Sequence, residues 1–110
     1  MLDRNRAYLE DMTEEVDFII KVTNKIPKEL FLTDNLLQHG IMMALVNIGE
    51  SANKLSPDFK EKYTDVEWKE IVGLRNITAH AYKAIEFDRI WENIVDDIPK
   101  LANTLKSVNI

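Results

Sequence analysis

Apolar residues along most of the chain recur at steps of three and four, the spacing that places side chains on one face of an α-helix. They do not alternate with polar residues, as they would in a half-buried strand. Glycine and proline number three each among 110 residues, so few positions favour turns. The sequence therefore predicts an all-α fold, in which residues 1–110 form one domain, an antiparallel helical bundle.

The first two expected helices are bounded by residues that commonly start or stop helices. The helical spacing runs through residues 8–23, and Pro27 closes this first pattern. Thr33 or Asp34 can cap the second helix, which ends before Ser56–Pro57, and that pair starts a further short helix. Four more apolar residues widen the stripe of the second helix: Leu36, Met42, Met43 and Val46. This width indicates either a face buried against another subunit or a more deeply buried helix.

Two longer helices are expected in the second half of the chain. Residues 64–67 read TDVE, the form of a capping box, which predicts a third helix that carries the octapeptide RNITAHAY of residues 75–82. The helical spacing returns in residues 90–108. Pro99 interrupts this fourth pattern, so we expect a kink or a break near Ile98.

Composition narrows the classes of function. Lys and Arg total 14 against 19 Asp and Glu, so the net charge is −5, and any site for a polyanion must be local. There is no cysteine, which excludes disulfides and thiolate chemistry, and neither a metal-binding motif nor an apolar run of about 20 residues is present. The charged opening, MLDRNRAYLEDM, is unlike a signal peptide. We therefore expect a cytoplasmic protein with no membrane segment, metal or cofactor.

The octapeptide combines residues whose directions differ on a straight helix. Arg75 and Tyr82 would lie about 20° apart, Asn76 and His80 about 40° apart, but Arg75 and His80 about 140° apart. Either the helix ends between Arg75 and His80 and the chain bends, or a second copy of the domain contributes to the site. Both interpretations predict a groove near the end of the third helix.

The chemistry of this pair suits RNA cleavage. Arginine presents a planar set of donors to phosphate oxygens, and histidine can accept and return a proton near neutral pH. His80 could deprotonate a 2′-hydroxyl while Arg75 stabilises charge on the phosphate, with no metal ion. The alternative is a structural polar pair at a helix end, and His39 is interpreted as structural. Glu50 and Asn53 either pack beside the groove or form a polar helix face.

RNITAHAY also fits the R-x4-H-x-Y form of the R-x4-6-H signature, and on it the chain resembles the HEPN superfamily, particularly the HepT-like toxins. Three flanking stretches resemble the surrounding helices of that family: NIGESANKLS (47–56), WKEIVGLRN (68–76) and WENIVDDIPKL (91–101). Family members often have proline before the first tryptophan of these stretches, where this chain has Glu67. The resemblance covers nearly the whole chain.

The resemblance implies a four- or five-helix HEPN bundle and a homodimer whose two motifs line a shared cleft. It implies a metal-independent endoribonuclease in which Arg75 and His80 are catalytic and Asn76 lies beside them. It also implies a partner, a MntA-like nucleotidyltransferase antitoxin that silences the toxin by AMPylation of Tyr82. The alternative is a non-catalytic HEPN subunit that binds a nucleotide or a nucleotidyltransferase, which the acidic composition also fits.

Overall fold

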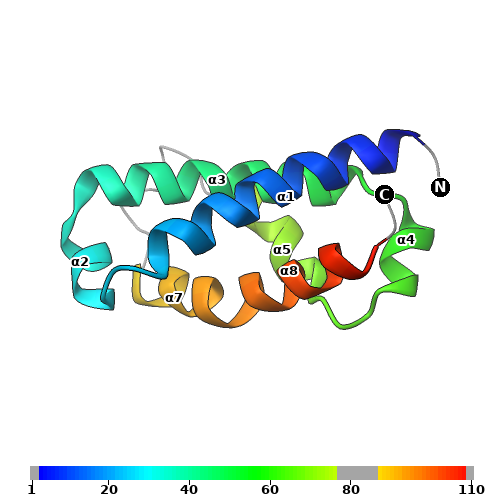
Figure 1. Ribbon diagram of the computed structural model, residues 1–110. Coiled ribbons are helices and arrows are strands. Elements are labelled where there is room, and N and C mark those ends of the chain that lie inside the picture. Colours follow the sequence, from blue (N-terminus) through cyan, green and yellow to red (C-terminus); the bar gives the residue numbers. More distant parts are fainter. Residues whose placement is uncertain (1–2, 77–86, 109–110) are drawn as a thin grey trace.

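Every regular element in the computed structural model is helical within the residues that it describes, 3–76 and 87–108 (Figure 1). The elements are α1 (Asp3–Thr23), α2 (Lys28–Thr33), α3 (Asn35–Lys54), α4 (Pro57–Lys62), α5 (Trp68–Gly73), the 3-10 helix η1 (Leu74–Asn76), α7 (Phe87–Glu92), the π-helix η2 (Asn93–Asp97) and α8 (Ile98–Ser107). In Figure 1, α1 runs antiparallel to α3 and to the chain of α7, η2 and α8. The predicted all-α antiparallel bundle is thus confirmed.

The core lies between α1, α3 and α8. Its most deeply buried side chains are at most 1% exposed and follow the helical spacing: Leu9, Met12, Val16 and Ile19 of α1; Ile41, Leu45, Ile48 and Ala52 of α3; Ile98 and Leu101 of α8. Burial of one such large apolar side chain stabilises a fold by about 1.5–3 kcal/mol. Within the described ranges, no helix combines the length and the apolar character that crossing a bilayer requires.

Two predicted caps are confirmed. Asp34 is the N-cap of α3, and its side chain accepts a hydrogen bond from the Leu37 amide at 2.9 Å. Ser56 is the N-cap of α4 and accepts from the Phe59 amide at 3.3 Å. Buried Asn5 of α1 donates to the Ser56 hydroxyl at 3.0 Å and accepts from the Ser56 amide at 3.2 Å. The start of α1 is therefore tied to the turn between α3 and α4.

The structure corrects the prediction of a capping box in residues 64–67. Helix α5 begins at Trp68, its N-cap is Glu67, and no side chain caps it. The indole nitrogen of Trp68 donates to the carbonyl of Tyr63 at 2.8 Å, and the Trp68 amide donates to the carbonyl of Val66 at 2.9 Å. These two bonds form a turn where the first turn of the helix was expected. The indole bond has a simple reason, because a half-buried indole N–H needs an acceptor. Helix α2 is a second departure, since the sequence pattern indicated no helix between Pro27 and Asp34.

The irregularity expected near Ile98 is present as a π-helix rather than as a break. The Ile98 amide donates to the carbonyl of Asn93, five residues earlier, and the backbone at Asp97 and Ile98 keeps right-handed helical angles. Pro99 has no amide hydrogen and cannot complete an α-helical bond, so the turn before it is free to widen. The Asn93 side chain donates to the Asp97 carboxylate at 2.8 Å across this wider turn.

Candidate functional site

Arg75 and Asn76 lie in η1, directly after α5. The Leu74 amide donates to the carbonyls of Ile71 and Val72, which tightens the chain from α-helical to 3-10 geometry. Leu74 is buried, whereas Arg75 and Asn76 are exposed. The α-helix therefore ends before Arg75, so the prediction that one helix carries the octapeptide is wrong for its first two residues.

The other two predicted site residues, His80 and Tyr82, lie outside the described residues. The described chain stops at Asn76 and resumes at Phe87. Leu74, two residues before the first of these ends, belongs to the core, and Phe87 packs against the core. The angle between Arg75 and His80 expected from helical geometry stays a prediction.

Helix α3 approaches the backbone of Arg75 at Gly49. A Cβ atom on Gly49 would overlap the backbone nitrogen of Arg75, and would lie 3.1 Å from the Arg75 Cα and 3.0 Å from the carbonyl oxygen of Ile71. Gly49 is itself buried in the described structure. Gly49 was not predicted as a site residue, although a glycine inside an apolar helical pattern is a signal of close backbone approach.

Aromatic side chains hold the other flank, where α7 packs on α2. The Phe31 ring lies 5.8 Å from the Phe87 ring, edge to face, and 5.4 Å from the Trp91 ring. The Lys28 ammonium lies 2.8 Å from the Asp88 carboxylate, and this hydrogen bond raises the pKa of Lys28 above its usual value. Helix α7, where the described chain resumes, is therefore well anchored.

An acidic pocket of about 320 Å³ lies between α1 and α3. It is lined by Asp11, Glu14, Glu15, Asn47, Glu50 and Ser51. The Asn47 amide donates to the Glu15 carboxylate at 2.5 Å. Glu50 shares this surface with the α1 carboxylates and Asn53 is exposed, which favours the interpretation of both as a polar helix face.

His39, which the sequence interpretation takes as structural, bonds within its own helix. It is exposed on α3, and its Nδ1 atom donates to the Asn35 carbonyl at 2.8 Å, one helical turn earlier. In the described part of the chain, no group of three His, Asp or Glu side chains is arranged to hold a metal ion.

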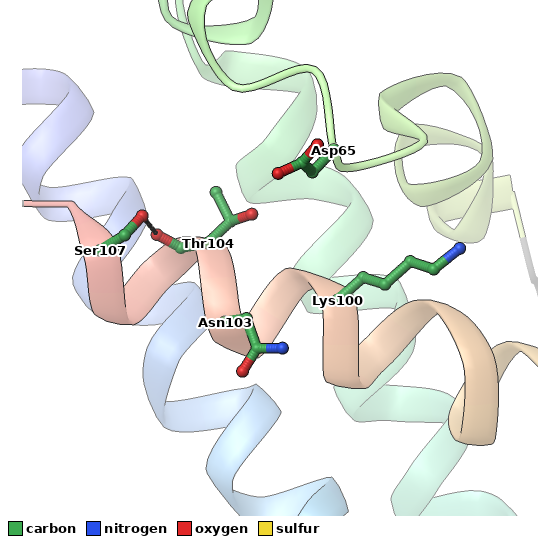
Figure 2. Close-up of a pocket in the computed structure, with 5 residues that line it drawn as sticks. All are labelled: Asp65, Lys100, Asn103, Thr104 and Ser107. Carbon is green, nitrogen blue, oxygen red and sulfur yellow. Dashed lines mark hydrogen bonds between the residues drawn. The ribbon is translucent and has the colours of Figure 1, made fainter.

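A second pocket, of about 510 Å³, opens between α8 and the turn before α5 (Figure 2). It is lined by Asp65, Lys100, Asn103, Thr104 and Ser107. Figure 2 shows the Lys100 side chain extending away from Asp65, and Ser107 donates to the Thr104 carbonyl at 2.7 Å. The part of its lining that the structure describes includes neither motif residue of η1, so the exposed pair of Arg75 and Asn76 remains the candidate site.

The residues that widen the stripe of α3 have two different environments. Met42 is 5% exposed and belongs to the core, whereas Leu36 is 85% exposed and Met43 is 62% exposed. Leu36 and Met43 are seven residues apart and therefore share one helix face. Phe18 of α1 is also exposed, and its ring lies 3.8 Å from the position of a Cβ on Gly40, between those two residues. An apolar surface of Phe18, Leu36 and Met43 thus lies open on the α1/α3 side.

The antiparallel all-α bundle, with an arginine and an asparagine exposed at the end of a tryptophan-led helix, defines a helical bundle of the HEPN type. A family profile described as Ribonuclease HepT-like matches residues 12–108. The chain therefore belongs to the HepT-like ribonuclease family.

Similar curated proteins carry ribonuclease names. "Putative RNase TTE0752" of Caldanaerobacter subterraneus subsp. tengcongensis is 36% identical over 94% of this chain and 92% of its own length. "Putative RNase MJ1380" of Methanocaldococcus jannaschii is 34% identical over 94% of both chains. "Probable ribonuclease HepT" of Thermococcus cleftensis is 33% identical over 88% of both chains. No solved structure matches the chain significantly.

Proposed function

We propose that this protein is the toxin of a HEPN/nucleotidyltransferase toxin–antitoxin pair and acts as a metal-independent endoribonuclease in the cytoplasm, with residues 1–110 as a single HEPN domain. The observation that carries the proposal is the exposure of Arg75 and Asn76 in η1, directly after α5, in a chain of the HepT-like ribonuclease family. A guanidinium that is exposed beside a helix end is accessible to a phosphodiester.

In the proposed reaction, His80 takes the proton from a ribose 2′-hydroxyl. The 2′-oxygen then forms a bond to the adjacent phosphorus as the bond from phosphorus to the 5′-oxygen breaks, and that oxygen leaves with a proton. The products are a 2′,3′-cyclic phosphate and a 5′-hydroxyl end. Arg75 stabilises the charge on the non-bridging oxygens, and Asn76, exposed beside it, donates to the same group.

We also propose that two copies of the chain build the active site. The exposed apolar surface of Phe18, Leu36 and Met43 supports this, because contiguous apolar surface on a helical face is typical of protein interfaces. A two-fold dimer would bring one copy of the 75–82 motif from each subunit to a common cleft. In such a cleft the arginine of one subunit can act on the same phosphodiester as the histidine of the other.

Control by a MntA-like nucleotidyltransferase is the last part of the proposal. The partner would attach AMP to the Tyr82 hydroxyl, with pyrophosphate leaving from ATP. The added phosphodiester charge could pair with Arg75, and the nucleoside would occupy the path of the RNA. The family and the tyrosine of the R-x4-H-x-Y motif support this expectation.

The second candidate function is a non-catalytic subunit that binds a nucleotide or a nucleotidyltransferase. The acidic pocket between α1 and α3 favours it, since four carboxylates on one surface and a net charge of −5 repel an RNA backbone. An assay of purified protein on RNA with EDTA separates the two candidates. Cleavage with 2′,3′-cyclic phosphate ends supports the nuclease, and intact RNA supports the binding subunit.

A further inference from the structure

Gly49 lies against the backbone of the proposed phosphate-binding arginine. We infer that Gly49 is a positioning residue for Arg75: because it has no side chain, η1 rests directly on α3, and this contact fixes where the Arg75 guanidinium leaves the surface. The inference rests on the proposed function, since it concerns the same site.

The contact joins two backbones, so side-chain rearrangement cannot relieve it. The atoms that a Cβ on Gly49 would meet are the nitrogen and Cα of Arg75 and the carbonyl oxygen of Ile71. Ile71 of α5 is 1% exposed and Leu74 of η1 is 6% exposed, so the chain that leads into Arg75 is held on the core. A methyl group at position 49 must therefore move the Arg75 backbone, by about 1 Å, a misplacement that can cost about 10²-fold in rate.

Space, and not backbone conformation, accounts for glycine at this position. None of the three glycines, all in the described residues, has a positive φ angle, so alanine can adopt the same helical conformation at each. A Cβ on Gly40 would make only an ordinary contact, at 3.8 Å from the Phe18 ring, and a Cβ on Gly73 would meet nothing within 4 Å. Gly49 alone among them faces backbone at less than van der Waals distance.

This difference supplies a matched control on the other side of the contact. Alanine is a better helix former than glycine, and Gly73→Ala adds a methyl group to α5, two residues before Arg75, where it meets nothing within 4 Å. Gly49→Ala adds the same methyl group to α3, against η1. The double variant Gly73→Ala/Gly49→Ala keeps the test possible where Gly49→Ala alone folds poorly, because the added alanine favours α5.

The test measures two quantities in each variant: the rate of RNA cleavage and the affinity for a non-cleavable 2′-deoxy oligonucleotide. Gly49→Ala is expected to lower the cleavage rate about 10²-fold, while Gly73→Ala leaves it unchanged. If Gly49 acts through Arg75, its effect on affinity should largely disappear in an Arg75→Ala background, because the arginine that it positions is gone. A general loss of stability would instead lower the affinity by the same factor with and without Arg75.

The outcomes separate this inference from the proposed function. If the native protein cleaves RNA but Gly49→Ala cleaves as fast as Gly73→Ala, the positioning role is overturned and the nuclease stands. The same holds if Gly49→Ala lowers the affinity by the same factor in the Arg75→Ala background as in the native one. If the native protein cleaves no RNA, the proposed nuclease fails, and the amide NMR signals of residues 71–76 then decide the structural part. These signals should shift in Gly49→Ala and stay in place in Gly40→Ala; unchanged signals in both variants overturn the contact itself.

Discussion

The ring of Phe31 on α2 meets the ring of Phe87 on α7 edge to face, with centroids 5.8 Å apart and planes inclined at 82°. His80 and Tyr82 lie in residues 77–86, outside the described ranges. Phe87 is the first described residue after this stretch, and Arg75 and Asn76 are the last two before it. The two described ends of the candidate site are therefore fixed to opposite parts of the bundle, one by aromatic packing on α2 and one by the close approach of α3.

The aromatic contact predicts a large effect of truncation at Phe31. Phe31 is 0% exposed and also packs on Trp91, so Phe31→Ala should lower the free energy of unfolding by about 3–5 kcal/mol in urea denaturation. Leu30→Ala shortens the neighbouring side chain of α2, which is 41% exposed, and should cost about 1 kcal/mol or less. Equal losses in the two variants would contradict the packing described for α2 and α7.

The exposed apolar surface predicts a dimer. Met43→Asp places a charge on this surface, and light scattering at micromolar concentration should then show monomer where the native protein shows dimer. Val95→Asp is the control, because Val95 is also exposed, at 48%, but lies on η2. A native protein that is monomeric under these conditions refutes the composite site.

The proposed control by AMPylation predicts that Tyr82 is the residue that is modified. Incubation with the partner nucleotidyltransferase and ATP should raise the intact mass by whole AMP units and reduce RNA cleavage. Tyr82→Phe keeps the ring but removes the hydroxyl, so the mass shift should vanish. Tyr63→Phe makes the same change in a ring that packs on Phe59, at 4.7 Å, and should leave the shift intact. A shift that persists in Tyr82→Phe places the modification at another residue.

The two histidines of the chain give a matched pair for the proposed base. His80→Ala should lower the cleavage rate by about 10²–10⁴-fold, because it removes the group that accepts the 2′-hydroxyl proton. His39→Ala should leave the rate unchanged, since His39 bonds within its own helix, to the Asn35 carbonyl. Similar rates in both variants would show that His80 is not the base.

Much of the fold could be predicted because its signals are local. Asp34 and Ser56 cap α3 and α4 through hydrogen bonds to amides three residues away, and the apolar spacing of α1 and α3 needs no knowledge of their partners. Helix α2 was missed because its six residues are too few to show a period. The start of α5 was misplaced because a bond from the Trp68 indole to the Tyr63 carbonyl replaced the expected cap.

The candidate site could be predicted in part, and for the same reason. Arg75 and Asn76 stand out in the sequence because the motif is contiguous, and the structure places both at the surface; their catalytic role stays a prediction. The contact of Gly49 with Arg75 joins residues 26 positions apart on two helices, so only the packing of α3 on η1 reveals it. The 3-10 turn at Leu74–Asn76 also has no clear signal in the sequence, because it follows from how Ile71 and Leu74 enter the core.

The central claim is that Arg75 takes part in metal-independent cleavage of RNA, and the most direct measurement is the cleavage rate in EDTA of the native protein, Arg75→Ala and Arg4→Ala. Arg4→Ala removes the same charge from an exposed position on α1. We predict cleavage with 2′,3′-cyclic phosphate ends by the native protein and by Arg4→Ala, and a rate lower by about 10²-fold or more in Arg75→Ala. Intact RNA with the native protein, or equal rates in the two arginine variants, would contradict the claim.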